Sequence, residues 1–137
     1  IGTDSYQNQS GTDYICYCFS SVRGYSKMGA YTGNGNADGP FVYTGFRPAW
    51  LMIKKTSGTG DWVIFDSVRS PSNVTKKTLL ADTTAVEGNV SDIDILSNGF
   101  KLGYTDSDTN SSGGTYVYMA FAEFPFVSSN SKPGTAR

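Results

Sequence analysis

The sequence predicts an all-β chain that folds as a two-sheet antiparallel β-sandwich or jelly roll, and three observations support this prediction. The 137 residues include 31 Ser and Thr, 9 Tyr and 8 Phe but only 5 Leu and 2 Glu, the reverse of the usage of helical proteins. Short apolar or alternating runs recur, with turn residues between them. The length is that of one domain with one core, and eight or nine strands at this spacing suit two packed sheets.

The first half of the chain holds four expected strands. Residues 14–19 are aromatic and apolar throughout, as in a strand that is buried on both faces. Residues 41–43 lie between glycine-containing turns. Residues 49–53 form a continuous apolar run, and a Ser-Gly-Thr-Gly turn leads from it to residues 61–66. We therefore expect the last two runs to pair as a hairpin.

The second half holds the remaining strands. Residues 78–81 and 93–96 are short and apolar, and Asn98-Gly99 is a type I′ turn signal that places residues 93–96 antiparallel to residues 100–104. Residues 115–122 alternate and carry aromatic side chains.

Three stretches are expected to lack regular structure. Residues 29–40 are rich in Gly, Asn and Asp, and residues 105–114 are rich in Asp, Ser and Asn. Residues 127–137 combine Ser and Thr with Pro133 and Gly134, so they are expected to form a flexible tail or an arm that reaches an adjacent subunit.

An internal repeat relates the start of the chain to its last strand. When residues 1–19 are set against residues 103–121, an offset of 102, eight of nineteen positions are identical without a gap. The identical pairs are Thr3/Thr105, Asp4/Asp106, Ser5/Ser107, Asn8/Asn110, Ser10/Ser112, Gly11/Gly113, Tyr14/Tyr116 and Phe19/Phe121. We interpret the match as a tandem repeat, the alternative being two edge strands that share a composition by chance.

The repeat predicts the domain organisation. Residues 1–22 are expected to be the closing loop and last strand of an upstream unit, packed on the same sandwich, and residues 23–126 to be one full β-sandwich domain. We therefore expect the chain to belong to a longer protein.

Composition excludes several classes of function. The net charge is −1 and the 11 basic residues are scattered, so nucleic acid is not an expected partner. No apolar run approaches the ~18 residues of a membrane span, so no membrane insertion is expected. Histidine is absent, which removes the commonest general base and metal ligand. Cys16 and Cys18 alternate along one expected strand, where we interpret them as small buried apolar residues.

Oxygen side chains on alternate residues give a weak calcium signal. The pattern is Asp106-x-Asp108-x-Asn110, followed by Ser112. The sixth position of a calcium loop, normally glycine, is Ser111, and the twelfth, normally acidic, is Val117. We therefore favour a solvated hairpin loop and expect neither a metal site nor a cofactor.

Catalytic residues are not expected. Asp92 and Asp94 form the one acid pair on a predicted strand face, and they are the pair that a glycan-degrading enzyme would use, but a solvent-facing role is favoured. Asp66 and Arg69 are close enough in sequence to form an ion pair across a turn. Aromatic residues next to Asp and Asn can stack on sugars, so the candidate binding residues are Tyr31, Asp38, Trp62, Tyr104, Asp106, Asp108 and Asn110.

Five segments resemble a repeat found in structural proteins of tailed bacteriophages, often marine ones, and the likeness covers about residues 14–126. The segments are GFRPAWLMIKK (45–55), DWVIFDSVR (61–69), LLAD with AVE (79–87), LSNGFKLG (96–103) and GGTYVYMAF (113–121). The resemblance implies a sandwich similar to concanavalin A-like and laminin-G-like domains, and a place in tandem tail-fibre or virion-surface proteins. It brings no catalytic residues. Lectin-like relatives often bind sugar through calcium, but their ligand pattern is not matched here.

Together these observations predict a non-enzymatic virion module, displayed on a tail fibre or on the capsid surface. The expected partners are other virion proteins, further copies of the chain in a homo-oligomer, and a host-surface glycan. The alternatives are a glycan-degrading β-sandwich enzyme and a purely structural capsid decoration module with no ligand.

Overall fold

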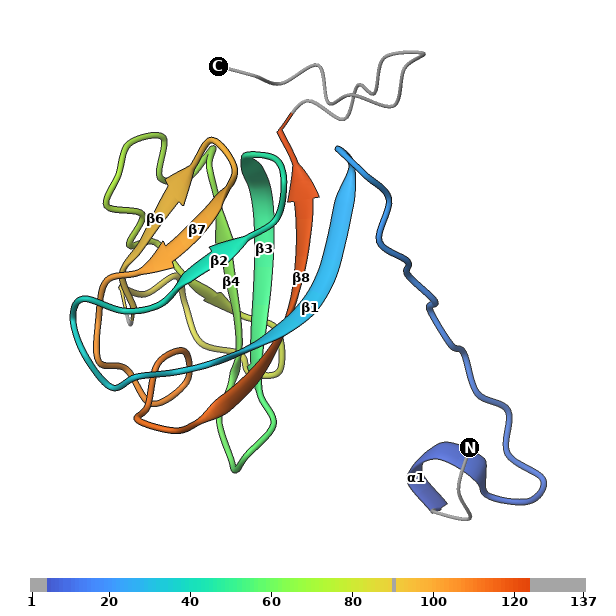
Figure 1. Ribbon diagram of the computed structural model, residues 1–137. Coiled ribbons are helices and arrows are strands. Elements are labelled where there is room, and N and C mark those ends of the chain that lie inside the picture. Colours follow the sequence, from blue (N-terminus) through green and yellow to red (C-terminus); the bar gives the residue numbers. More distant parts are fainter. Residues whose placement is uncertain (1–4, 90, 124–137) are drawn as a thin grey trace.

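The computed structural model describes residues 5–89 and 91–123, which form two antiparallel sheets that face each other (Figure 1). The predicted all-β sandwich is confirmed. The five-stranded sheet has the order β1 (Ser26–Thr32), β8 (Thr115–Ala122), β3 (Pro48–Lys55), β4 (Trp62–Asp66) and β5 (Leu79–Leu80). The three-stranded sheet has the order β2 (Phe41–Tyr43), β7 (Gly99–Leu102) and β6 (Ile93–Leu96).

The core lies between the two sheets and takes alternate residues from their strands. Because successive side chains of a strand point to opposite faces, every second residue of each strand reaches this space. Both sheets contribute to one buried cluster: Val42, Phe46, Leu51, Ile53, Val63, Phe65, Ile93, Ile95, Phe100, Leu102, Tyr116, Tyr118 and Ala120. A single core therefore holds both layers together.

β8 lies inside the five-stranded sheet although it is the last described strand of the chain. It pairs with β1 on one side and with β3 on the other, so Met119 lies opposite both Met28 and Met52. Its inward side chains are those of Tyr116, Tyr118 and Ala120.

The two predicted hairpins are confirmed, with one change. β3 pairs with β4 across the glycine-rich turn, and β6 pairs with β7. Leu96 lies opposite Gly99, so Ser97 and Asn98 form the connection and Gly99 belongs to the strand. A Cβ on Gly99 would lie 2.2 Å from the carbonyl oxygen of Val42 in β2, which explains why glycine occupies this strand position.

The prediction of a buried strand over residues 14–19 is wrong. The structure has no strand there, and all six residues are exposed. The segment leads away from the sandwich to a single helical turn, α1 (Ser5–Asn8), as Figure 1 shows. The place between β1 and β3 that suits a strand of this composition is filled by β8. The strand that sequence analysis missed is β1, which forms the edge of the sheet.

We call residues 5–21 the arm. No apolar residue of the arm belongs to the core cluster. Phe19 contacts Phe121, with ring centroids 5.9 Å apart. Ser21 also contacts the sandwich, because its hydroxyl accepts a hydrogen bond from the backbone N–H of Met28 at 3.0 Å. The expectation that residues 1–22 pack on this sandwich stays a prediction. At the end of the arm the chain turns, and Val22 and Ser26 exchange two backbone hydrogen bonds of 2.9 Å. The interpretation of the arm as part of an upstream unit stays a prediction.

Two further findings complete the description. The expected tail, residues 127–137, lies outside the described residues. Within residues 5–89 and 91–123, no helix is both long and apolar enough to cross a membrane.

Candidate functional site

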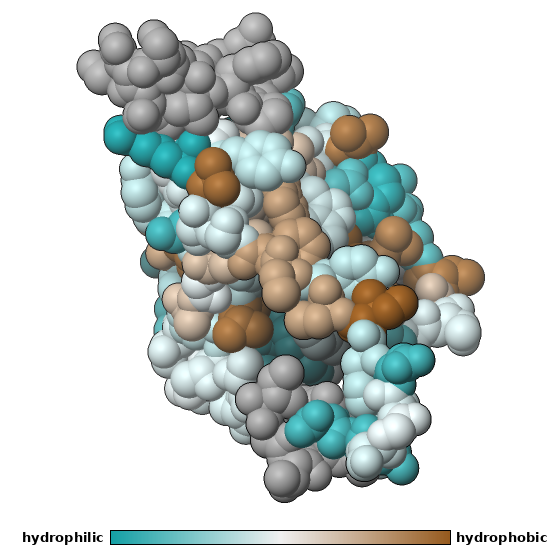
Figure 2. Space-filling view, turned by 90° about the vertical axis from the view of Figure 1, so that its right-hand side faces the viewer, coloured by the Kyte–Doolittle hydropathy of each residue, from teal (hydrophilic) through white to brown (hydrophobic). Residues whose placement is uncertain are grey.

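The candidate functional site is the outer face of the five-stranded sheet, the face that points away from the core. Its side chains alternate with the core residues along each strand, yet most of them are apolar. They are Met28 and Ala30 of β1, Val117, Met119 and Phe121 of β8, Trp50, Met52 and Lys54 of β3, and Trp62, Ile64 and Asp66 of β4. Figure 2, which views the molecule from the side where β1 lies, shows apolar side chains gathered between more polar margins.

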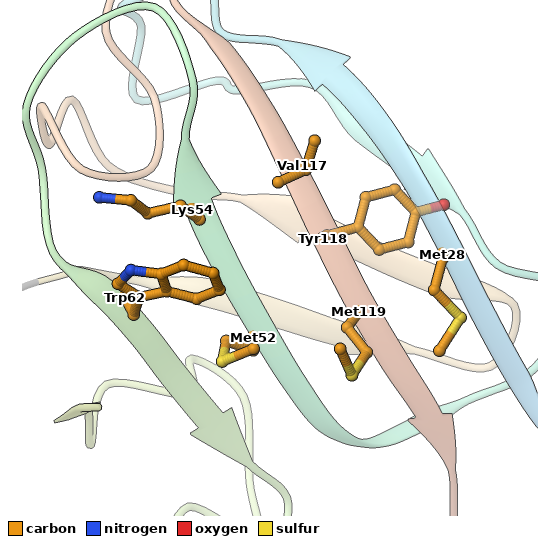
Figure 3. A pocket seen from close by; sticks show the side chains of 7 residues that line it. All are labelled: Met28, Met52, Lys54, Trp62, Val117, Tyr118 and Met119. Carbon is orange, nitrogen blue, oxygen red and sulfur yellow. The ribbon is translucent and has the colours of Figure 1, made fainter. Parts of the chain in front are cut away.

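A shallow hollow of about 90 Å³ lies in the middle of this face. Three methionines from adjacent strands line it side by side, as Figure 3 shows: Met28, Met119 and Met52. Methionine is flexible and polarisable, so it adapts to the shape of a partner. The hollow is well below the ~300–1,000 Å³ of a small-molecule site. Its size suits a single side chain of a protein partner.

One margin of the hollow combines a cation with an aromatic ring. Lys54 and Trp62 lie opposite each other on β3 and β4, and Lys54 Nζ lies 5.7 Å from the centroid of the indole ring. Trp62, a predicted binding residue, is 39% exposed and belongs to this outer face. The other six predicted binding residues lie on β1 and in the loops that precede β2 and β8.

Asn110 holds two loops together. It is fully buried, and its side-chain oxygen accepts a hydrogen bond from the backbone N–H of Asn34 at 2.9 Å. Its amide nitrogen donates to the carbonyl oxygens of Asn36 and Tyr104, at 2.8 and 2.9 Å. Both donors and the acceptor are therefore engaged within the chain, which gives Asn110 a structural role at this end of the sandwich.

Tyr31 anchors the same loop from the core side. Its hydroxyl donates to the carbonyl oxygen of Thr109 at 2.6 Å, and its ring stacks on that of Tyr116 with centroids 5.1 Å apart. Burial raises the pKa of the Tyr31 hydroxyl far above its usual value, and the nearby Tyr116 and Asp106 act in the same direction. Tyr31 is thus a neutral packing residue.

The acidic residues of these loops differ from one another in environment. Burial raises the pKa of Asp106, although hydrogen bonds from the loop backbone and from the Thr109 hydroxyl oppose the shift. Asp38 is exposed and ion-paired with Lys101, whose hydrogen bond and charge lower its pKa. Tyr104 is exposed, and Asp108 lies against the turn at Gly60. Within the described ranges, no group of three or more His, Cys, Asp or Glu residues could hold a metal ion.

Comparison with known proteins identifies the family of the chain. A family model described as a domain of unknown function, DUF7483, matches residues 1–125. The chain belongs to the DUF7483 family. No curated protein and no solved structure matches it. The DUF7483 match includes the arm as well as the sandwich.

The acid pair of this DUF7483 domain faces basic residues. Asp92 and Asp94 flank the buried Ile93, as the alternation predicts. Asp92 is paired with Lys76 at 3.1 Å, and Asp94 lies opposite Lys101 in the pairing of β6 with β7. Asp92 is therefore ion-paired, whereas the ammonium group of Lys101 pairs with Asp38.

A second, larger groove of the DUF7483 domain has a volume of about 430 Å³. It lies between the start of β1 and the turn after β2, and it is lined by Ser21, Arg23, Gly24, Ser26, Lys27, Tyr43, Thr44 and Gly45. Two cations, three hydroxyl side chains and an exposed tyrosine line this groove. None of the seven predicted binding residues lies in it, and glycan binding stays a prediction.

Sequence analysis missed the outer face as a whole. The apolar run over residues 49–53 predicted a strand but not that half of its side chains would lie on the solvent side. The sequence did contain a signal for this face. An antiparallel strand with one solvated face normally alternates apolar with polar residues, and residues 49–53 are apolar throughout.

Proposed function

We propose that this domain is a non-enzymatic structural module of a bacteriophage virion, displayed on a tail fibre or on the capsid surface, and that it acts in assembly by packing its outer face against another copy. The observation that carries the proposal is the row of methionines, Met28, Met119 and Met52, across an apolar sheet face that the core does not use. The place on a virion is supported by the resemblance of the five sequence segments to phage repeats.

The composition of the outer face favours a protein partner. The middle of a protein interface is rich in aromatic residues and methionine and poor in charge, and a polar rim surrounds it. The middle row of this face is apolar and holds Met28, Met119, Met52 and Ile64, whereas Lys54 and Asp66 lie in the rows on either side of it. An apolar face of this kind costs free energy in water, and a partner that covers it removes that cost.

The experiment measures association of the full chain by analytical ultracentrifugation over a range of concentrations. Wild type is expected to self-associate, and M52K/M119K is expected to sediment as a monomer because two ammonium groups would then face the partner. V86K is the matched control, since Val86 is 89% exposed and lies in the loop between β5 and β6, outside the strands of this face. Circular dichroism and thermal unfolding show whether the variants keep the fold.

Two outcomes would contradict the proposal. One is a wild-type chain that stays monomeric at the highest concentration it reaches. The other is an M52K/M119K chain that associates as strongly as wild type and V86K. A folded, monomeric double variant beside an associating control supports the outer face as the interface.

A further inference from the structure

The arm and the segment that contains β8 share local geometry as well as sequence. In the arm, the backbone N–H of Thr12 donates to the carbonyl oxygen of Gln9 at 3.3 Å. At the positions 102 residues later, the N–H of Gly114 donates to the carbonyl oxygen of Ser111 at 3.0 Å. The same turn therefore stands before both segments.

A glycine and a tyrosine complete the match. Gly11 and Gly113 both have positive φ, 77° and 69°, in the left-handed region that favours glycine. The hydroxyl of Tyr14 accepts a hydrogen bond from the backbone N–H five residues before it at 3.0 Å, and that of Tyr116 does the same at 2.8 Å. Two turns with the same bonds indicate one structural motif used twice.

The surroundings of the two turns differ, so the shared geometry comes from the sequence itself. The turn before β8 packs against the loop over residues 33–39, where Gly33 and Gly35 make close backbone contacts with it. The turn in the arm is exposed. The arm thus carries the start of a β8-like strand without a sheet beside it.

The strand residues of the arm also suit the place of β8. The positions that β8 turns toward the core hold an aromatic residue and two small thiols in the arm, and the positions that it turns outward hold apolar residues. The inward pairs are Tyr14/Tyr116, Cys16/Tyr118 and Cys18/Ala120, and the outward pairs are Ile15/Val117, Tyr17/Met119 and Phe19/Phe121.

The topology allows the arm to occupy the place of β8, because the arm can fold back along β1 as a hairpin. β8 runs antiparallel to β1, and Phe121 lies opposite Ser26, the first residue of β1. The arm enters β1 directly, and Phe19 already contacts Phe121. With residues 20–25 as a hairpin loop, residues 13–19 would run antiparallel to β1 in the direction that β8 now takes.

We propose that the arm is a second closing strand, which fits the place of β8 between β1 and β3 of a sandwich of this kind. In this chain β8 holds the place. The ring of Tyr118 packs 5.4 Å from that of Phe100 and fills the space above Gly29, which the smaller Cys16 would leave empty. The arm can therefore take this place when β8 is weakened, in its own sandwich or in that of a second copy. This inference rests on the arm and β8 alone, so its failure would leave the proposed outer-face interface standing.

The experiment places a buried charge in one closing strand at a time, in the full chain. A120D removes β8 from competition, C18D does so for the arm, and the third variant carries both changes. Chymotrypsin cleaves after exposed aromatic residues, so wild type is expected to be cut in the arm after Tyr6, Tyr17 and Phe19, which are 88%, 79% and 55% exposed. Tyr17 and Phe19 lie in the strand-like part of the arm and report on it. In A120D the arm is expected to become protected while cleavage moves to residues 116–121.

Cooperative thermal unfolding is the second readout. C18D is expected to unfold as wild type does, A120D to keep a transition at lower temperature, and the double variant to lose it. Light scattering of A120D separates the two sources of the arm: a monomer uses its own arm, and a dimer exchanges arms between copies. Either result supports the proposal.

A milder variant keeps the proposal testable if a buried charge simply unfolds the chain. A Cβ on Gly29 would lie 2.7–2.9 Å from the ring of Tyr118, so G29A disfavours β8 but not the smaller Cys16 of the arm. Protection of the arm in G29A is the expected result. The proposal is overturned if A120D is as unfolded as the double variant and the arm of G29A is cut as fast as in wild type.

Discussion

The two faces of the five-stranded sheet contain the same kinds of residue but differ in what covers them. On β3, Leu51 and Ile53 point inward and have no exposed surface, whereas their neighbours Trp50 and Met52 point outward and are only partly buried. On β4, Phe65 is fully buried and Ile64 beside it is not. The two faces therefore differ not in residue type but in cover: the three-stranded sheet packs on the inner face only.

This difference separates the requirements of folding from those of function. Full burial of a large apolar side chain contributes about 1.5–3 kcal/mol, so the inner face accounts for much of the stability of the sandwich. The outer face keeps apolar area that folding leaves in contact with water. The domain is thus more apolar than its own fold requires, which is the argument for a partner.

Substitution of two adjacent residues of β4 would test this comparison most strongly. F65A is expected to lower the free energy of unfolding by about 3–5 kcal/mol, because it leaves a cavity in the core. I64A, one residue away on the outer face, is expected to cost about 1–2 kcal/mol, because its site is already partly solvated. Urea unfolding followed by tryptophan fluorescence measures both. Equal losses would show that the outer face contributes to the fold as much as the core does.

Asp66, a carboxylate at the margin of the outer face, is expected to make a smaller contribution to stability, and one that depends on pH. Burial raises the pKa of Asp66, but hydrogen bonds from the backbone N–H and the guanidinium of Arg69 outweigh it, and the net pKa lies below the unfolded value of 3.8. The stabilisation is therefore present above pH 3.8 and is lost as pH falls through the lower, folded pKa.

The variant D66N is expected to lose about 1–2 kcal/mol of stability at neutral pH, because it removes a charge-assisted pair. The difference from wild type should shrink on acidification below pH 3.8. Thermal unfolding at neutral and acid pH measures it, and a difference that does not change with pH would count against this assignment.

The smallest expected change in stability concerns a buried threonine. Among the described residues, Thr75 Oγ1 is the buried side-chain polar atom without a hydrogen-bond partner. T75V replaces the hydroxyl with a methyl group of similar size, so stability is expected to stay the same or to rise by about 1 kcal/mol. T78V is a control at a buried threonine. A clear loss in T75V would mean that its hydroxyl has a partner in solution.

The strands could be predicted from local sequence where burial was regular. β2 and β6 have the predicted bounds, and β8 matches residues 115–122, because their apolar residues and turns agree. β1 was missed because its sequence, SKMGAYT, mixes polar and small residues, as an edge strand tolerates. Residues 14–19 were predicted as a buried strand because they are aromatic and apolar throughout, as residues 116–121 of β8 are. Composition does not reveal which of two similar segments occupies one place.

The site was harder to predict because it depends on tertiary structure. The sequence placed Asn110 in a polar loop, where an amide is usually solvated, but its burial depends on a loop more than seventy residues away. The methionine row likewise arises only when β1, β8 and β3 lie side by side. Neither arrangement could be predicted from the sequence, because the residues involved lie far apart along the chain.

The place of β8 in the sheet also governs how the chain folds. β8, the last of the described strands to be synthesised, lies between β1 and β3, so until it arrives both strands have an unpaired edge. Its pairing with β1 joins Ser26 to Phe121, and such distant pairing slows the folding of β-sandwiches to about milliseconds to seconds. During synthesis each chain therefore passes through a period with two open edges and an apolar arm beside them. In this state neighbouring nascent copies are most prone to pair with one another.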